Sequence, residues 1–467
     1  MLYSKITVNI ILSLINIVLT ILFVKIFTNF LDAKDYGKFA VIISLVVFIA
    51  AFFEFGSNYI ISRYVRFKND VIFKKIFSSI VNLYFFIGVI FSVILSLFFL
   101  CFQSLQEISP IYVDPSVVFL ILASFPFRVV LNALPSVLIA VGKPIWVSAG
   151  TLCQSVVNGL CVGLLLYYGG YGFEVLLVAN CVSNIIRAII YFFSVKELYE
   201  VCLSKKICFR LMNYAPLVLS SEGLVKFKEF YINATLSSLA NFSIVGSWNY
   251  SQYFRSGLLI ISNSVSSVTW SKYLHHSRNS TNDYNTSLRS LWILNQLGLL
   301  FFGIFFLFFG EVSLSYLTND QFVEAYDFIL VFVLYSMLQS FTKFDTAKIY
   351  CNGLGQSYSF ITFISILLSL ILFYILKDYI GIHALLIAIF SEQLFIRAFI
   401  KIFLFYKYKN FIKENELLFV CFLYGGLLFG EFGNFEWMVY LMVPVSIGTM
   451  ILFGFVQIKN LSSIKLS

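Results

Sequence analysis

The stretch IGVIFSVILSLFFLCF, residues 87–102, contains no charged side chain and shows no alternation of apolar and polar residues. A strand of a membrane β-barrel would alternate with a period of two, whereas a helix that spans the hydrocarbon core needs about 20 mainly apolar residues. Apolar runs of this length recur almost end to end along the chain. The stretch therefore predicts a polytopic helical membrane protein.

The composition of the whole chain excludes a water-soluble protein. Of the 467 residues, 60% are hydrophobic, 19% are aromatic and only 12% are charged, whereas soluble domains contain about 25% charged residues. Too few polar side chains remain to cover a soluble surface. The first apolar run, residues 7–24, is too long for a signal-peptide core and has no small-residue cleavage site after it, so we expect an uncleaved first helix.

Hydropathy and connector positions predict an all-α fold of about fourteen transmembrane helices. They are expected near residues 7–28, 39–62, 78–102, 116–140, 145–168, 173–195, 212–237, 246–271, 289–309, 326–349, 357–376, 380–404, 416–432 and 437–457. We expect two pseudo-symmetric six-helix lobes (1–197 and 212–406), a cytoplasmic linker between them (198–211) and two additional C-terminal helices (407–467). Because the last two helices are short, a total of twelve stays open.

Basic residues are distributed very unevenly between the two sides of these helices. Of the 32 lysines and arginines, 21 fall on one side, four fall on the other, and seven lie deeper within predicted helices. The four exceptions are Lys25, Lys34, Lys38 and Lys377. Because cytoplasmic connectors retain lysine and arginine, this bias predicts that both termini are cytoplasmic.

The chain shows no pattern typical of an enzyme, a metal site or a nucleic-acid-binding protein. Its eight cysteines lie in predicted helices or on the cytoplasmic side, so we expect no disulfide. The three histidines do not cluster as metal ligands, and we find no phosphate-binding loop or nucleophile paired with a base. The net charge of +9 has no soluble domain to carry a basic face. We therefore predict no cofactor, although a separate ATPase partner stays open.

Charged residues at membrane depth usually mark a water-filled cavity or a buried partner. The cations at this depth are Arg128, Arg187, Lys226, Lys228, Arg255, Lys343 and Arg397, and the acidic residues are Glu54, Glu222, Glu229, Asp345 and Glu392. The excess of cations suits an anionic ligand. Arginine suits phosphate best, because its planar guanidinium group donates two hydrogen bonds at once.

Helical spacing selects the candidate site residues from this set. Arg128 lies in a polar stripe with Ser124 and Asn132, and Arg255 lies in another with Gln252; neither arginine has a carboxylate within one turn. The candidate substrate-binding residues are Arg128, Arg255, Lys226, Lys228, Lys343, Asn132 and Gln252, and the candidate coupling or gating residues are Glu54, Glu222, Glu229 and Asp345. The alternative is that such stripes only join packed helices by hydrogen bonds.

Residues 29–65, NFLDAKDYGKFAVIISLVVFIAAFFEFGSNYIISRYV, resemble the polysaccharide flippases of the MOP exporter superfamily. In that family the first helix ends in L-x-x-x-[DE]-[FY]-G, which corresponds here to Leu31 through Gly37. The second helix ends in an acidic residue, an aromatic residue and glycine, as at Glu54 to Gly56. We expect Gly37 to allow a tight outer turn and Gly56 to allow close approach of a neighbouring helix.

The second half of the chain carries a weaker version of the same pattern. LSSLANFSIVGSWNYS, residues 236–251, parallels FLDAKDYGKFAVI, residues 30–42, and aligns Gly246 with Gly37. Such an internal repeat is typical of transporters built from two similar halves. The chain departs from the family at Lys228-Glu229, where relatives commonly have an aspartate followed by a basic residue.

The resemblance implies a flippase of the bacterial inner membrane. Its substrate would be an undecaprenyl-diphosphate-linked oligosaccharide repeat unit, for O-antigen or a similar surface polysaccharide, moved from the cytoplasmic to the periplasmic leaflet by alternating access around a cationic central cleft. Other candidate partners are a polysaccharide polymerase and a chain-length regulator. Two alternatives stay open: a cation-coupled drug or metabolite exporter, and a membrane polysaccharide polymerase, which the short outer connectors disfavour.

The topology can be tested with reporter fusions. We expect fusions at Ser204 and Asn279 to report the cytoplasm and fusions at Ser109 and Asp320 to report the periplasm, because the basic connectors stay inside. Paired alkaline phosphatase and green fluorescent protein reporters at each position provide the measurement. A periplasmic signal at Ser204 would contradict the assignment of the two lobes.

Overall fold

The computed structural model describes residues 2–28, 30–53, 61, 71–101, 113–168, 172–218, 223–239, 241–259, 263, 282–318, 320–351, 355–381 and 383–408. Throughout these ranges the regular structure is helical and no strand is present. The all-α prediction is therefore confirmed. The two predicted helices near 416–432 and 437–457 lie outside the described residues.

The twelve helices predicted up to residue 404 all have counterparts in the structure. The elements are α1 (Leu2–Phe27), α2 (Ala33–Ala51), α4 (Val71–Cys101), α6 (Pro115–Leu131), α7 (Leu134–Ala140), α8 (Pro144–Tyr167), α9 (Phe173–Ser194), the short 3-10 helix η2 (Lys196–Leu198), α10 (Lys205–Val218), α11 (Leu224–Leu239), α12 (Phe242–Leu258), α14 (Asn282–Thr318), α15 (Ala325–Cys351), α16 (Gly355–Ile380) and α17 (His383–Tyr408). Among the described residues, six helices are long and apolar enough to cross a membrane.

Several helix ends differ from the prediction because hydropathy detects only the apolar part of a helix. The predicted outer connector 310–325 is largely helical, since α14 continues to Thr318. The helix α10 begins at Lys205, inside the predicted linker 198–211. The predicted span 116–140 is interrupted after Leu131, where Pro135 occupies the first turn of α7. Pro126, by contrast, lies within α6 without ending it.

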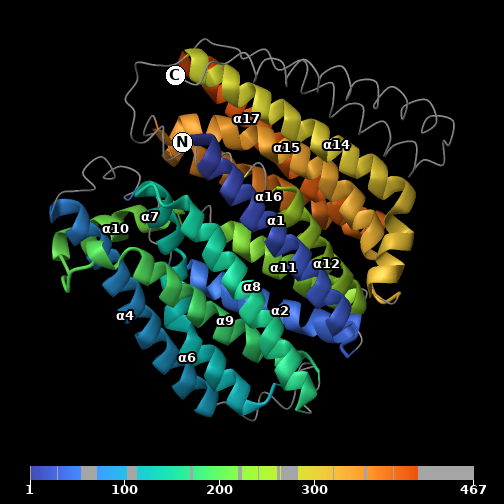
Figure 1. Cartoon of the computed structure of the whole chain (residues 1–467), viewed down its shortest axis with the longest axis horizontal. Helices are drawn as coiled ribbons and strands as arrows, with labels where there is room; N and C mark the ends of the chain where they lie inside the picture. The colour runs from blue at the N-terminus through green and yellow to red at the C-terminus, as the bar shows by residue number, and fades with distance from the viewer. Residues whose placement is uncertain are drawn as a thin grey trace.

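The helices form two packed groups (Figure 1). In the first half of the chain α4 packs on α6, α6 on α9, α8 on α9, and α1 on α8. In the second half α14 packs on α15, while α15 and α16 each pack on α17. The helices α2 and α12 lie in contact between the two groups, and α2 also packs against α11. The core of the molecule is therefore divided, and the α2–α12 pair is its main connection.

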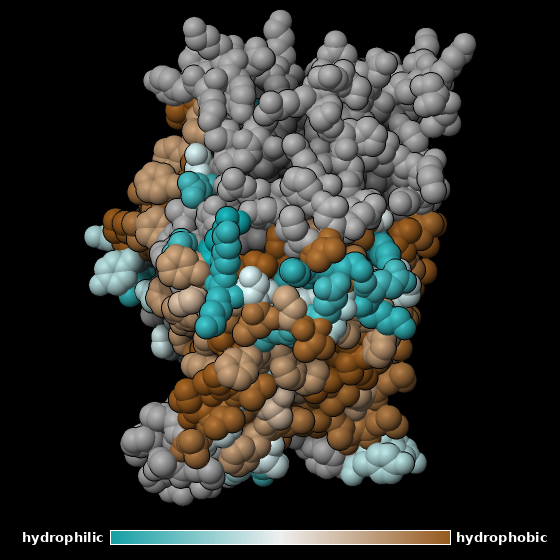
Figure 2. All heavy atoms as spheres, turned by 90° about the vertical axis from the view of Figure 1, so that its left-hand side faces the viewer, coloured by the Kyte–Doolittle hydropathy of each residue, from teal (hydrophilic) through white to brown (hydrophobic). Residues whose placement is uncertain are grey.

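One end of the first group is hydrophilic and its flank is apolar. Figure 2 shows a hydrophilic band across the face at which α10 lies, with a broad hydrophobic area below it. Exposed basic residues from the start of α4, from η2 and from α10 lie at this end: Lys75, Lys196, Lys205 and Lys206. These lysines belong to the side assigned to the cytoplasm, and the membrane orientation itself stays a prediction.

The contact between α2 and α12 is reciprocal and depends on two glycines. A Cβ atom on Gly37 of α2 would lie 1.8 Å from the carbonyl oxygen of Phe242, the first residue of α12. A Cβ atom on Gly246 of α12 would lie 2.2 Å from the carbonyl oxygen of Ala33, the first residue of α2. Each glycine thus receives the backbone of the other helix, as at an interface with two-fold symmetry.

The local sequence around each glycine sets up this contact. Asp32 caps α2 by accepting a hydrogen bond of 2.7 Å from the amide of Asp35, and Asn241 caps α12 by accepting one of 2.9 Å from the amide of Ile244. In each helix the glycine follows its capping residue by five positions. The prediction that Gly37 forms a tight turn is wrong, because Gly37 is buried within α2 and serves close helix approach. Gly56 lies outside the described residues.

We predict that Gly37→Ala destabilises the protein by about 1–3 kcal/mol, because the new methyl group meets a backbone carbonyl that cannot turn away. Gly246→Ala should have a similar effect for the same reason. The matched control is Gly163→Ala in α8, where an added Cβ meets nothing within 4 Å. Thermal unfolding of the purified proteins in detergent provides the measurement. Equal melting temperatures for Gly37→Ala and Gly163→Ala would contradict the proposed role of this contact.

Candidate functional site

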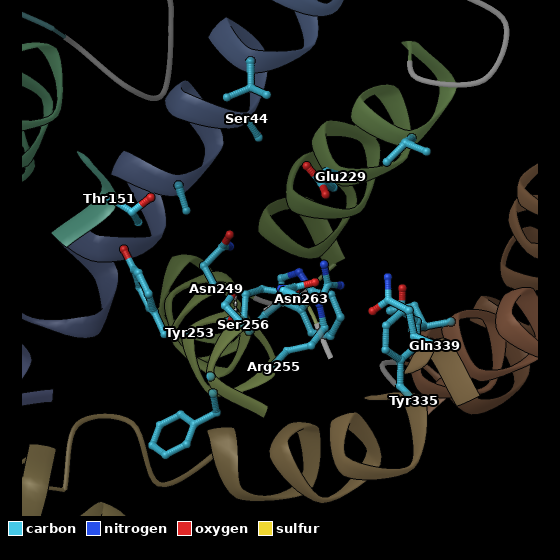
Figure 3. A pocket seen from close by; sticks show the side chains of 18 of the residues that line it. Ser44, Thr151, Glu229, Asn249, Tyr253, Arg255, Ser256, Asn263, Tyr335 and Gln339 are labelled. Atoms are coloured by element: carbon cyan, nitrogen blue, oxygen red, sulfur yellow. Dashed lines mark hydrogen bonds between the residues drawn. The ribbon is translucent and has the colours of Figure 1, made fainter. Parts of the chain in front are cut away.

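A cavity of about 1060 Å³ lies between the two helix groups. Its wall contains residues of α1, α2, α8, α11, α12, α15, α16 and α17. The wall extends from Tyr36, close to the glycine contact, to Asn9 and Pro144. Asn9 lies near the N-terminal end of α1, and Pro144 is the first residue of α8. Figure 3 shows part of this wall, with side chains of α2, α11, α12 and α15 directed toward the same space.

Neutral polar side chains and aromatic rings make up much of the wall. The polar stripe of α1 lines it with Asn9, Ser13, Asn16 and Thr20. This stripe also joins helices, because the Ser13 and Ser148 hydroxyls lie 3.3 Å apart and the Ser148 hydroxyl donates a hydrogen bond to Asn9. Other wall amides come from α11, α12, α15 and α17: Asn233, Asn249, Gln252, Gln339 and Gln393. The aromatic members include Tyr36, Trp248, Tyr253 and Tyr335.

Among the described residues, four charged side chains line the cavity. Lys228 and Glu229 come from α11, Arg255 from α12 and Glu392 from α17. Lys228 and Glu392 form an ion pair in which both residues are buried, at 7% and 4% exposure. Glu229 instead pairs with Lys226, at 2.9 Å between Nζ and Oε2. Both carboxylates in the described part of the wall are therefore held by a lysine.

Lys226 and Lys228 each form an ion pair with a carboxylate, whereas Arg255 forms none with a described carboxylate. Its guanidinium carbon lies 5.1 Å from the centre of the Tyr335 ring and 5.7 Å from that of Phe332, so the two rings hold the cation by cation–π attraction. Its Nε is buried and has no hydrogen-bond partner among the described residues. In Figure 3 the Arg255 side chain lies between Glu229 and the pair Tyr335 and Gln339. A buried, unpartnered donor of this kind is costly unless a ligand or water accepts from it.

The structure brings together only part of the predicted site. Lys228, Glu229, Gln252 and Arg255 line the cavity, whereas Arg128, Asn132 and Lys226 are not among its wall residues. Glu54 and Glu222 lie outside the described residues, as do the side chains of Lys343 and Asp345 on α15. Sequence reasoning noted Glu392 at membrane depth but did not place it in the site. Its only signal was a carboxylate beside Gln393 in an apolar helix.

Arg128 lies behind the wall, within the first helix group. Its Nη1 donates a hydrogen bond of 3.2 Å to Oδ1 of Asn180, and Asn180 is a wall residue. The Asn132 amide donates to the carbonyl oxygen of Ala50 at 3.3 Å. The polar stripe of α6 therefore contacts α9 and α2 rather than opening into the cavity. Arg128 therefore contacts the cavity wall through Asn180.

The cavity is closed at the end where the two glycines meet. Besides the α2–α12 contact, Lys25 Nζ donates a hydrogen bond of 2.8 Å to the carbonyl oxygen of Tyr316. Gln321 Nε2 donates one of 2.9 Å to the carbonyl oxygen of Thr28. These two bonds join the end of α1 to α14 and to the turn that follows it, so they connect the two helix groups directly.

No metal centre is formed by the part of the chain that the structure describes, since it contains no group of three histidine, cysteine, aspartate or glutamate side chains able to hold an ion. The site therefore offers charged groups, amides, hydroxyls and aromatic rings. Such a wall can bind and release a polar ligand by hydrogen bonds and charge.

Comparison with known proteins places the chain in a family and a fold. The polysaccharide biosynthesis protein family matches residues 2–270. No curated protein gives a significant match.

Solved structures share the fold at low sequence identity. A MOP superfamily transporter from Pyrococcus furiosus, described as having a binding pocket of reverse polarity, matches with a TM-score of 0.62 and 15% identity over 85% of this chain and 94% of that chain. The bent form of the Vibrio cholerae MATE transporter VcmN matches with a TM-score of 0.58 and 12% identity over 87% of this chain and 97% of that chain. The MATE transporter ClbM in complex with Rb+ covers 90% of this chain and 97% of its own at a TM-score of 0.57 and 12% identity.

The three structural neighbours are described as transporters, and at 12–15% identity they show the fold that this chain shares. The family match covers more than half of the chain, and the fold agrees with it. The chain belongs to the polysaccharide biosynthesis protein family and has the all-helical fold of the MOP superfamily transporters.

Proposed function

We propose that the protein is a flippase that moves undecaprenyl-diphosphate-linked oligosaccharides from the cytoplasmic to the periplasmic leaflet of the bacterial inner membrane. The observation that carries this proposal is the large cavity with a wall of amides, hydroxyls and aromatic rings inside a membrane protein of this family. Its volume of about 1060 Å³ is at the upper end for a small-molecule site. That size suits a sugar head group better than a compact drug.

The chemistry of the wall matches the two parts of such a head group. Sugar hydroxyls exchange hydrogen bonds readily with amides such as those of Asn9, Asn249 and Gln339, and the C–H faces of sugar rings pack against aromatic side chains. The diphosphate must lose much of its hydration in the membrane, which is very costly without partners. Arg255 offers it a planar, permanently charged donor within the cavity. The lipid tail can stay in the bilayer throughout.

The paired state of the carboxylates favours this function over a cation-coupled drug exporter. A wall carboxylate that bound a cation or a cationic drug would need to be available. Here Glu229 and Glu392 are both held by lysines, and the one wall cation that no described carboxylate holds at ion-pair distance is Arg255. The resting site is thus better prepared for an anion.

For transport we propose alternating access between two lobes, residues 1–197 and 212–406, with both termini in the cytoplasm. Opening the closed end would require the Lys25–Tyr316 and Gln321–Thr28 hydrogen bonds to break and the glycine contact to separate. The polymer could be O-antigen or a similar surface polysaccharide. A polysaccharide polymerase and a chain-length regulator would act on the delivered repeat units.

Arg255→Ala should reduce surface glycan to background, because the diphosphate loses its permanent cation, and Arg255→Lys should retain part of the activity because charge remains without the planar fork. Arg128→Ala should have a smaller effect, since Arg128 does not line the cavity and contacts its wall through Asn180. Quantified surface glycan at equal membrane protein levels provides the measurement. Normal export by Arg255→Ala at wild-type protein level would exclude Arg255 as a diphosphate ligand.

Cross-linking tests alternating access. Linking Thr28→Cys to Gln321→Cys in an otherwise cysteine-free protein should stop export, because it holds the closed end shut, and a reducing agent should restore it. The matched control is Asn82→Cys with Cys202 retained, a pair within the first helix group where Asn82 Nδ2 donates to the Cys202 carbonyl at 2.9 Å. This link should leave export unchanged. Full export by the cross-linked Thr28–Gln321 pair would contradict opening at this end.

A further inference from the structure

Apolar side chains are exposed in the connector between the two halves of the chain. Val201 is 92% exposed and Leu203 is 57% exposed, whereas Cys202 between them is half-buried. Phe209, in the second turn of α10, is 66% exposed. All of these residues belong to the segment 198–211, outside the predicted membrane spans. Exposed apolar side chains that gather in one place usually mark an interaction site.

The connector is held in this conformation by α4. Three hydrogen bonds join them: from the Glu200 amide to Ser78 Oγ at 2.8 Å, from the Ser204 amide to Ser79 Oγ at 3.0 Å, and from Asn82 Nδ2 to the Cys202 carbonyl oxygen at 2.9 Å. The bonds lie before, between and after the two exposed residues. Val201 and Leu203 therefore cannot turn toward the protein unless this attachment breaks.

The start of α10 continues the same surface and adds positive charge to it. Leu211 is fully buried and marks the side of the helix that faces the protein. By helical spacing, Phe209 and Met212 share one flank of the exposed surface, and Lys206 and Arg210 share the other. A helix with adjacent apolar and basic flanks is typical of one that lies in the boundary between lipid and water.

Four exposed lysines at this end of the molecule have no ion-pair partner among the described residues: Lys75, Lys196, Lys205 and Lys206. They come from α4, η2 and α10. Two exposed carboxylates lie on the same segment, and one of them, Glu200, is paired with Lys74 at 3.9 Å. Positive charge is therefore in excess here, and it complements an anionic partner.

The surroundings of this surface indicate what kind of partner it meets. Figure 2 shows the hydrophilic band on the face at which α10 lies, directly above a broad hydrophobic area. A bilayer presents phosphate groups at such a boundary and acyl chains next to it. Lysine side chains reach phosphate while their carbon stems stay on apolar surface. An anionic phospholipid thus matches both the lysines and the apolar side chains beside them.

We propose that residues 201–203 and the first turns of α10 form a binding site for an anionic phospholipid of the leaflet at which α10 lies. The lipid phosphate accepts hydrogen bonds from Lys205 and Lys206, and the acyl chains pack against Val201, Leu203 and Phe209. The bound lipid holds the connector between the two halves at the membrane surface. This inference does not rest on the proposed transport function, because it concerns the outer surface and not the cavity.

The experiment places a reporter on the connector of the full-length protein in lipid nanodiscs. Val201→Cys in an otherwise cysteine-free protein is labelled with bimane, and its quenching by phosphatidylglycerol with brominated chains is compared with quenching by brominated phosphatidylcholine. Each lysine near an anionic membrane surface favours it about fivefold. We therefore expect phosphatidylglycerol to be preferred at this position by at least about fivefold.

A second label controls for the bilayer as a whole. Ile94→Cys lies on the exposed apolar flank of α4. Bimane at this position should be quenched equally by the two lipids, because no lysine selects the head group there. An equal preference for phosphatidylglycerol at both labels would overturn the proposal, since the preference would then belong to the nanodisc and not to the connector.

Charge variants assign the preference to the lysines. Lys205→Gln/Lys206→Gln should lower the preference for phosphatidylglycerol at least about fivefold. The matched control is Lys34→Gln/Lys377→Gln, which removes the same charge from the opposite side of the predicted membrane spans and should behave as wild type. If the first variant is poorly folded, raising the salt concentration from 0.05 to 0.5 M should reduce the wild-type preference several-fold, because salt screens exposed charges.

Three further results would overturn the proposal. Equal quenching of the Val201 label by the two lipids would show membrane contact without an anionic site. No quenching by either lipid would place this surface against water or another protein. A preference that survives both Lys205→Gln/Lys206→Gln and high salt would show that these lysines do not select the lipid.

Discussion

The arrangement of this protein depends on one backbone contact, where α2 and α12 cross at Gly37 and Gly246. Each glycine lets the other helix bring a carbonyl oxygen to a distance that no side chain would permit. The contact fixes the two helix groups at one end, and the cavity opens between them beyond it. The contact of Gly37 with α12 and the contact of Gly246 with α2 are equivalent. Neither half of the protein is therefore the stationary part about which the other half would move. Motion about this end would change both halves in the same way.

Within the cavity, Arg255 and the Lys228–Glu392 ion pair are held by different kinds of contact. Arg255 is held by the rings of Phe332 and Tyr335. Lys228 and Glu392 hold each other in a buried ion pair. Among the described wall residues, Lys228, Glu229 and Glu392 all have an ion-pair partner.

The sequence predicted the helices well because long apolar runs have few other stable forms in a membrane. It predicted their ends less well at Lys205 and Thr318, where polar residues continue a helix that hydropathy no longer detects. Arg128 and Arg255 each lie in a polar stripe of helical period, yet of these two arginines only Arg255 lines the cavity. Helical period shows which residues share a face, but not which neighbour covers it. The Lys228–Glu392 pair spans 164 positions and has no local signal.

The reciprocal glycine contact also has a consequence for biogenesis. Gly37 and Gly246 are 209 positions apart, so at about 5–20 residues per second α12 emerges roughly 10–40 s after α2. During that interval the face of α2 around Gly37, which later receives the backbone of α12, has no α12 to pack against. The first helix group can assemble early through α4, α6, α8 and α9. The contacts of α2 with α11 and α12 form only after the second half is synthesised, so α2 has to wait for them in the membrane.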